Sequence, residues 1–307
     1  MGCYGAGSLG DDAILQGMLT LLGKENLTVV SFSPEKTSIL FEVPTVMDSL
    51  FSTDYDSLIL GGGGWVYVGH VLHYTPRIQK FLDLGKKVIV YGVGTDTLIG
   101  NEETVRDVFN KVDELSVRTT WDKSHLESIG ITREIKVVED PSLLIPTPPK
   151  NVVHSVLSKH FELDKPLMGL CISRKVFYTA KFIRMLQNLD YTFVPLVQCR
   201  HEFHAINLDT ISLTALFTYL GLTHEVQKWM RILFTPSFMK GIIQSMDYVI
   251  TTRKHPLMWA RQKNIPVTVI ASRHALALKE YSKAFKAEKI LFWKDFVENE
   301  EIESSDI

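Results

Sequence analysis

The chain has 307 residues, of which 45% are hydrophobic and 22% charged, and its formal net charge is -2. This length allows two domains of ordinary size, and the composition is typical of globular proteins. The small net charge disfavours nucleic acid as a partner, and three widely spaced cysteines disfavour a disulfide framework or a metal cluster. No apolar run is long enough to span a bilayer, and no signal-peptide pattern is present, so we expect a cytoplasmic protein.

In the first half, apolar segments alternate with segments of helical periodicity. Strands that are apolar on both faces and separated by helices predict a parallel sheet covered on both sides. The expected strands are 27–32, 57–60, 87–92, 114–117 and 135–138, and the expected helices are 12–22, 74–84, 105–110 and 120–129. Three prolines among residues 146–149 then predict a stiff linker, which separates a domain at 1–147 from one at 148–307.

The second half repeats the alternation. The expected strands are 167–172, 191–197, 248–250 and 267–270, and the expected helices are 179–188, 211–220, 224–232, 236–244, 257–263 and 275–287. The pattern predicts an α/β fold with two Rossmann-like, doubly wound domains facing a central cleft. A ligand is expected in that cleft, at the carboxyl ends of the strands.

Residues 5–10, GAGSLG, have the GxGxxG spacing of a dinucleotide-binding turn. Only residues 1–4 precede the first glycine, so the leading strand is expected to be missing or reduced to a stub. The strand 27–32 ends without the acidic residue that holds a ribose. Asp11 and Asp12 fall on the first helical turn, where they would repel a pyrophosphate. These features argue against a dinucleotide.

Four glycines at residues 61–64 directly follow the expected strand 57–60. They predict a strand-to-helix turn whose backbone is approached closely by another group. His70 and His73 have the spacing of metal ligands, but no cysteine or acidic residue completes a site, so no metal is expected. Aromatic and imidazole side chains after the glycines would suit sugar stacking, although a core tryptophan and surface histidines are the commoner outcome.

Arg253 and His255 lie between the strand 248–250 and a helix expected to start near Pro256. Cations at a helix N-terminus are unfavourable unless an anion binds there, so this segment predicts a phosphate or carboxylate site. Lys254 is interpreted as a solvated loop residue. Arg174 follows the strand 167–172 and is expected at the same edge of the sheet, where two arginines could grip a small dianion.

Two further strand ends carry charged residues. Arg118 follows the strand 114–117 and is interpreted as structural, pairing with a carboxylate such as Asp122. Asp140 precedes Pro141 and is predicted to cap a turn.

Several of these motifs, in this order, resemble the polysaccharide pyruvyl transferase family. The resemblance covers residues 1 to about 272 and rests on the glycine-rich turn with its Asp-Asp pair, the glycine run, Tyr91-Gly-Val-Gly94, Ser116-Val-Arg118, Leu126-Glu-Ser-Ile-Gly130, Asp140-Pro141 and Arg253-x-His255. It implies a GT-B-like fold and transfer of a pyruvyl group from phosphoenolpyruvate to sugar hydroxyls of a cell-surface polysaccharide or its precursor. No cofactor is implied beyond phosphoenolpyruvate as co-substrate.

The resemblance also implies roles for individual residues. Arg253, His255 and Arg174 match the family's donor site, with His255 as the expected acid/base. The residues expected to bind the acceptor are Gly7, Asp11, Asp12, Gly63 and Gly64, of which Asp12 could also accept a proton. The acceptor would be a glycan or a lipid-linked or nucleotide-linked sugar. We therefore expect the protein to work in the cytoplasm and, if it associates with a membrane, to do so at the inner face.

Two positions depart from the family pattern: Thr119 stands where an aspartate is usual, and Pro256 where an alanine is usual. Two alternatives therefore stay open. A nucleotide-sugar glycosyltransferase of the same architecture would need a carboxylate for the ribose, which Asp247 or Glu225 would have to supply. A catalytically inactive glycan-binding relative is the other alternative.

Overall fold

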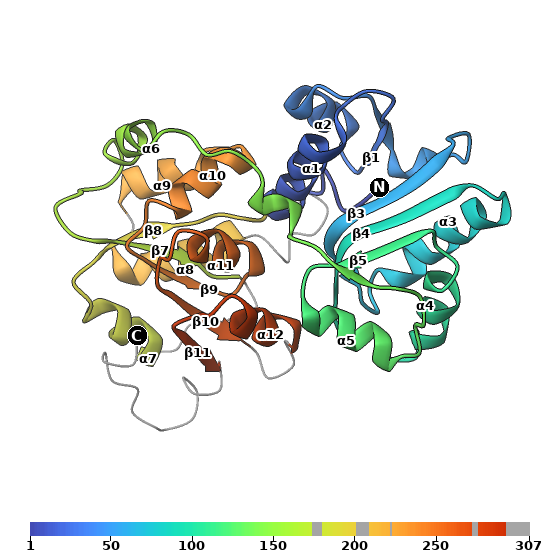
Figure 1. The fold of residues 1–307 in the computed structure, drawn as a ribbon. Helices are drawn as coiled ribbons and strands as arrows, with labels where there is room; N and C mark the ends of the chain where they lie inside the picture. Colours follow the sequence, from blue (N-terminus) through green and yellow to red (C-terminus); the bar gives the residue numbers. More distant parts are fainter. Residues whose placement is uncertain (174–179, 201–208, 222, 272–275, 293–307) are drawn as a thin grey trace. The chain divides into compact units, whose positions relative to one another are not determined.

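The computed structural model describes residues 1–173, 180–200, 209–221, 223–271 and 276–292 of the chain. The chain divides into two compact units, Met1–Ile145 and Pro146–Ile307. The division falls at the start of the proline segment, close to the boundary expected after residue 147. Both units are α/β structures with parallel sheets (Figure 1).

Unit 1 contains a four-stranded parallel sheet of order β3-β4-β5-β6 and a separate parallel pair, β1-β2. Its elements are α1 (Leu9–Leu22), β1 (Val29–Ser31), α2 (Pro34–Phe41), β2 (Thr45–Met47), η1 (Asp48–Leu50), β3 (Ser57–Val66), α3 (Val71–Asp83), β4 (Lys87–Thr95), α4 (Glu102–Phe109), β5 (Glu114–Val117), α5 (Thr120–Ser128), β6 (Lys136–Val137) and η2 (Pro141–Leu143). The Met1 carbonyl accepts a hydrogen bond from Gly61 N–H at 2.9 Å, and the Tyr4 carbonyl accepts one from Phe32 N–H at 3.0 Å. Residues 1–4 therefore bridge β1 and β3, where a leading strand would lie.

Alternate residues of the central strands in unit 1 face two different apolar clusters. Leu58 and Leu60 of β3 join the cluster that includes α3 and α4, whereas Ile59 of β3 and Tyr91 of β4 pack against the cluster built on α1. Figure 1 shows α3 and α4 on one side of these strands and α1 on the other. Because both faces are covered, these strands are apolar on both sides, which is the pattern seen in the sequence.

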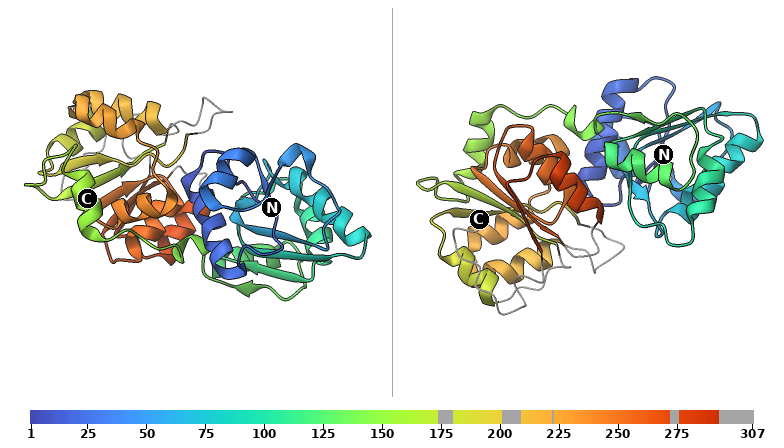
Figure 2. Two further views of the ribbon diagram at one scale, coloured as in Figure 1. Left: turned by 90° about the horizontal axis from the view of Figure 1, so that it is seen from above. Right: turned by 60° about the horizontal axis from the view of Figure 1, so that its bottom comes forward.

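Unit 2 contains a five-stranded parallel sheet of order β11-β10-β9-β7-β8. Its elements are α6 (Lys150–Leu157), β7 (Leu167–Cys171), α7 (Ala180–Gln187), β8 (Thr192–Pro195), α8 (Asp209–Leu220), α9 (His224–Arg231), α10 (Pro236–Ile243), β9 (Tyr248–Thr251), α11 (Lys254–Arg261), β10 (Val267–Ala271), α12 (Leu276–Ala284) and β11 (Lys289–Phe292). Helices α7 and α8 lie on one face of this sheet and α11 and α12 on the other, as the right-hand view in Figure 2 shows.

The strand order of unit 2 reverses between β7 and β9. From β7 the chain moves outward to β8, and from β9 it moves through β10 to β11 on the other side. In open α/β sheets, ligands bind outside the carboxyl ends of the strands at such a reversal. A ligand site in this unit is therefore expected in the segments that follow β7, β8 and β9.

Candidate active site

The segments that follow β7 and β9 are joined by hydrogen bonds. Thr252 N–H donates to the Cys171 carbonyl at 3.0 Å, and Ser173 N–H donates to Thr252 Oγ1 at 2.9 Å. Arg174, expected to bind the donor, directly follows Ser173 and lies outside the described residues. The segment leading to Arg174 therefore starts beside the one that carries Arg253.

Arg253 occupies the N-cap position of α11, because this helix begins at Lys254 and not near Pro256 as predicted. Proline is tolerated in a first helical turn, where N–H groups lack partners within the helix anyway. The guanidinium of Arg253 faces a carboxylate: its Nε and Nη2 donate to Asp209 Oδ1 at 3.2 and 2.5 Å. The Arg253 side chain is 27% exposed, so part of it remains accessible to solvent.

Asp209 is the first residue of α8, and its side chain is fully buried. Its Oδ2 accepts the backbone N–H groups of Gln198 and Cys199 at 3.0 and 2.9 Å. Burial raises the pKa of the Asp209 carboxyl group, while Arg253 and the two N–H donors act in the opposite direction. Burial alone would lower the pKa of Arg253, but the facing carboxylate more than offsets this effect and raises it. The four donors favour a carboxylate facing a guanidinium cation.

His255, the expected acid/base, is the second residue of α11 and is half-buried. Its ring centroid lies 5.8 Å from that of Trp259, one turn further along the helix. Lys254 is not the solvated loop residue that was expected: it begins the helix, and its Nζ lies 4.7 Å from the centroid of the Tyr281 ring, a cation–π contact. Arg253 and His255 thus share the first turn of a helix at the predicted edge of the sheet.

Gln198, in the segment that follows β8, is buried at 4% exposure. Neither its Nε2 nor its Oε1 has a hydrogen-bond partner within the part of the chain that the structure describes. Leaving such a group unpaired costs about 1–3 kcal/mol. A water molecule or a polar ligand group is therefore expected to pair with this amide.

In unit 1, the glycine-rich turn forms a tight entry to α1. Gly5 and Gly7 have φ of 71° and 84°, a conformation that side chains disfavour. A Cβ on Gly5 would also lie 2.3 Å from Ser31 Oγ. Ser8 caps the helix by accepting the Asp11 N–H at 3.5 Å. The spacing of the glycines thus reflects backbone geometry.

Asp12 is directed back into this turn, and its Oδ1 accepts the Gly5 N–H at 2.9 Å. Burial raises the pKa of Asp12 to about 7, to which the negative charge of Asp11 contributes, while the bond from Gly5 opposes the shift. A carboxyl group with a pKa near neutrality can both accept and donate a proton in a reaction. The role of Asp12 as a proton acceptor stays a prediction.

Residues 61–64 do not form the turn that was predicted. They lie inside β3, which continues to Val66 and shifts its register against β4 after Gly63. Gly62 and Gly63 have φ of 46° and 95°, and a Cβ on Gly62 would lie 2.2 Å from Ile14 Cγ2. Glycine is required here because α1 packs directly on the bulged strand.

The expected acceptor residues are partly brought together. Asp11 Oδ1 lies 3.4 Å from the point where a Cβ on Gly63 would stand, and the same point lies 3.7 Å from Trp65 Cδ1. Gly64 is exposed. Gly7 lies in the turn before α1, one residue before its Ser8 cap. Trp65 is a core residue, and its Nε1 has no partner among the residues described.

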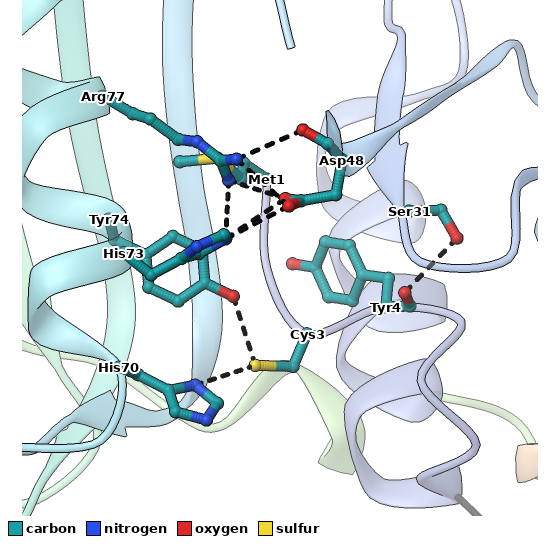
Figure 3. Close-up of polar contacts among 9 residues, drawn as sticks. All are labelled: Met1, Cys3, Tyr4, Ser31, Asp48, His70, His73, Tyr74 and Arg77. Carbon is teal, nitrogen blue, oxygen red and sulfur yellow. Dashed lines mark hydrogen bonds and ion pairs between the residues drawn. The ribbon is translucent and has the colours of Figure 1, made fainter. Parts of the chain in front are cut away.

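A polar cluster joins α3 to the first residues of the chain (Figure 3). Cys3 Sγ lies 3.4 Å from His70 Nδ1 and 3.2 Å from Tyr74 Oη, whereas His73 Nε2 lies 3.2 Å from Asp48 Oδ2. The two histidines therefore have different partners, and the described residues contain no group of three metal-ligating side chains. Burial raises the pKa of Cys3 to about 12, which keeps this thiol protonated and a poor nucleophile.

The sequence profile of the polysaccharide pyruvyl transferase family matches residues 9–274. The chain belongs to this family. No curated protein matches it significantly. Among the described residues, no helix is both long and apolar enough to cross a bilayer.

Two solved structures are similar to the chain. HepE of Anabaena, in complex with UDP-glucose, is 12% identical with a TM-score of 0.52, covering 91% of this chain and 81% of its own. A putative UDP-N-acetylglucosamine 2-epimerase from Listeria monocytogenes is 12% identical with a TM-score of 0.58, covering 97% and 85%. These likenesses confirm the predicted GT-B-like α/β fold class.

The chain departs from its family pattern beside a buried ion pair. Arg118 donates to Asp140 Oδ2 at 2.7 Å, so its partner is not Asp122 as suggested above. Asp140 also caps η2, as predicted, by accepting the Ser142 N–H at 2.8 Å. Thr119, in place of the usual aspartate, caps α5 and donates to Asp122 Oδ2 at 2.7 Å. Arg118 and Thr119 therefore have structural partners in unit 1.

Sequence reasoning missed Asp209 and Gln198. Asp209 lies 44 positions from Arg253, and no local motif links the two. Gln198 follows a strand of the same sheet, so its place at the carboxyl edge was available as a signal. A single polar residue after a strand is too common to be singled out.

Proposed function

We propose that this chain transfers the pyruvyl group of phosphoenolpyruvate to two hydroxyl groups of a sugar, forming a pyruvate ketal on a cell-surface polysaccharide or its precursor. The family match supports a transferase of this kind. The observation that carries the proposal is the fixed guanidinium of Arg253, with His255 beside it, where the strand order of unit 2 reverses. Phosphoenolpyruvate is an anion with two charged groups, which suits such a site.

In this proposal, unit 2 binds the donor. Arg253 and Arg174 face the carboxylate and the phosphate of phosphoenolpyruvate, because guanidinium groups bind such anions through paired N–H donors. The N–H groups at the start of α11 add partial positive charge. No metal ion or organic cofactor takes part in the scheme.

The chemistry begins with proton transfer to the methylene carbon of phosphoenolpyruvate, which leaves an oxocarbenium-like centre at the neighbouring carbon. One sugar hydroxyl attacks this centre and loses its proton. The second hydroxyl then displaces phosphate, which departs with a proton, and the ring of the ketal closes. His255 is the proposed acid/base on the donor side, since imidazole titrates near neutral pH.

Unit 1 is the proposed acceptor side. Asp12 accepts a hydroxyl proton, a role for which its pKa of about 7 is suited. Asp11, Gly7, Gly63 and Gly64 form the surroundings of the sugar. The acceptor is a lipid-linked or nucleotide-linked glycan, and the reaction takes place in the cytoplasm at the inner face of the membrane.

The contacts of two carboxylates disfavour a nucleotide-sugar glycosyltransferase. Asp247 accepts the Leu167 N–H at 2.7 Å, which places it at the amino ends of β9 and β7, away from the edge where ligands bind. Glu225 lies on α9 and pairs with Lys228 at 2.8 Å. Asp247 is therefore not placed to hold a ribose at the carboxyl edge, and Glu225 is already paired with a cation.

The test combines binding and turnover. Phosphoenolpyruvate should raise the melting temperature of the chain, whereas UDP and GDP should not. Phosphate release from phosphoenolpyruvate is then measured with a panel of lipid-linked and nucleotide-linked glycans. Arg253→Ala should abolish binding, and His255→Ala should retain binding but lose turnover. Full pyruvyl transfer by both variants would refute the assignment. Binding of a glycan without any phosphate release would favour the inactive relative.

A further inference from the structure

Asp209 links two segments at the carboxyl edge of the unit 2 sheet. Its Oδ2 accepts the N–H groups of Gln198 and Cys199, which follow β8, and its Oδ1 accepts two N–H groups of Arg253, which follows β9. A fully buried carboxylate with four donors has no capacity left for a ligand. Asp209 can therefore act on a substrate only through the residues that it holds.

The contact fixes the direction of the Arg253 guanidinium. A guanidinium carries five N–H donors in one plane, and here Nε and Nη2 both point at Asp209 Oδ1. The remaining donors lie outside this contact. Because Nε and Nη2 share Asp209 Oδ1 as their acceptor, the guanidinium plane of Arg253 cannot rotate without losing one of these two hydrogen bonds.

We propose that Asp209 is a positioning residue for the phosphoenolpyruvate site, holding Arg253 so that the outer N–H donors of its guanidinium meet an anionic group of the donor. The inference rests on the proposed function. The inference adds Asp209, a residue that touches no substrate. Because the Asp209–Arg253 pair is neutral as a whole, the binding of phosphoenolpyruvate should depend on the direction of the guanidinium more than on net charge.

Two features of the structure favour positioning over a purely structural pair. The segment after β8 is already tied to α8 by the Gln198 and Cys199 N–H groups, so the fold does not require Arg253 for that link. The buried amide of Gln198, without a partner among the described residues, lies in the same segment. The segments that carry this amide and the Arg253 guanidinium are both held by Asp209, and a buried amide without a partner is expected where a polar ligand or its water binds.

The central experiment measures phosphoenolpyruvate affinity by isothermal titration calorimetry. Asp209→Asn keeps the shape but removes the charge, and its single amide oxygen can accept from the two backbone N–H groups or from Arg253 but not from both, so we expect affinity to fall about 10-fold to 100-fold. Arg253→Lys keeps the charge without the fork and should lose a similar factor. Asp247→Asn alters a carboxylate that also accepts a backbone N–H, at the opposite edge of the sheet, and should bind like the wild type.

Chemical rescue separates positioning from a general structural effect. Guanidinium ion should restore phosphoenolpyruvate binding to Arg253→Ala, because Asp209 still offers its carboxylate. It should not restore binding to the Arg253→Ala, Asp209→Asn double variant. If Asp209→Asn alone folds poorly, Asp209→Glu is combined with Arg253→Ala instead. This variant retains the carboxylate, so guanidinium ion should restore part of the phosphoenolpyruvate binding.

The outcomes distinguish this inference from the proposed function. Wild-type affinity in Asp209→Asn, or rescue that does not depend on Asp209, overturns the inference while leaving the proposed function intact. If the wild type binds no phosphoenolpyruvate, the proposed function fails. The contact itself is then judged from the Arg253 Nε–H resonance in NMR spectra, which should be protected from exchange in the wild type and lost in Asp209→Asn; an unprotected wild-type signal also overturns the inference.

Discussion

Replacing Asp12 with asparagine should stabilise the folded chain at alkaline pH and have little effect at acidic pH. The variant keeps the hydrogen bond, because an asparagine Oδ1 can accept the Gly5 N–H in place of the carboxylate oxygen. Only the charge is removed. The expected difference therefore reports the cost of holding an ionised Asp12 in its partly buried position.

The magnitude follows from the pKa of Asp12, which is raised from 3.8 to about 7. This difference corresponds to at most ~4 kcal/mol of stability, and solvent near the group should reduce it to ~2 kcal/mol. Below about pH 4 the group is protonated in both states and has no cost. As the pH rises through 7, the unfolded chain has already released the proton and the folded chain must hold the charge. The wild type therefore loses stability between about pH 4 and about pH 7.

The assay is urea denaturation of both proteins at about pH 4 and about pH 8. Glu35→Gln is the matched control, because Glu35 is an exposed carboxylate in the first turn of α2. This control should show the same difference from wild type at both pH values. A difference between Asp12→Asn and wild type that does not change with pH would refute the reasoning, and with it the basis for Asp12 as a base near neutral pH.

Four further substitutions test the packing within each of the two units. Asp140→Asn removes the charge that faces the buried Arg118 and should cost about 3–5 kcal/mol in the free energy of unfolding; a loss below about 1 kcal/mol would mean that the pair is solvated. Gly62→Ala should cost ~3 kcal/mol and Gly85→Ala only ~1 kcal/mol, because both have positive φ but only the first lacks room for a Cβ; equal losses would contradict the close packing. Gln198→Leu should raise stability by ~1 kcal/mol in thermal unfolding, and a large loss would reveal a hidden partner.

Strand β3 shows why an apolar sequence pattern can misplace the end of a strand. The apolar pattern stops at Leu60, so the strand was expected to end there and the glycines to form a turn. Strand pairing uses backbone groups, however, and β3 pairs with β4 as far as Val66. Glycine weakens a strand when its surface is open, but here Ile14 fills the space above Gly62. The residue that packs against Gly62 belongs to α1, and the sequence around the glycines does not reveal this contact.

The predictions of where α11 starts and which residue pairs with Arg118 were wrong for different reasons. Pro256 was taken to mark the first helical position, yet proline fits anywhere in a first turn, so it fixes the start only to within a few residues. For Arg118, the nearby Asp122 was suggested because of its short separation in sequence. Asp140 is the partner because β5 and β6 are neighbours in the sheet and both residues follow their carboxyl ends. A parallel sheet was predicted but the order of its strands was not, so the sequence alone did not point to this pair.

The glycine-rich turn and the arginine site together show why one fold motif serves different chemistry in the two units. In unit 1, the Gly5 N–H that an anion would use is already taken by Asp12, and Asp11 places another carboxyl group on the same helical turn. In unit 2, the negative charge is placed behind the site: Asp209 is buried beneath Arg253 and leaves outer guanidinium donors available. A carboxylate at the surface of a helix start excludes an anion, whereas a carboxylate behind an arginine aims the cation at one. The GxGxxG spacing of unit 1 therefore does not indicate an anion site, because it does not encode where the aspartate carboxyl groups lie.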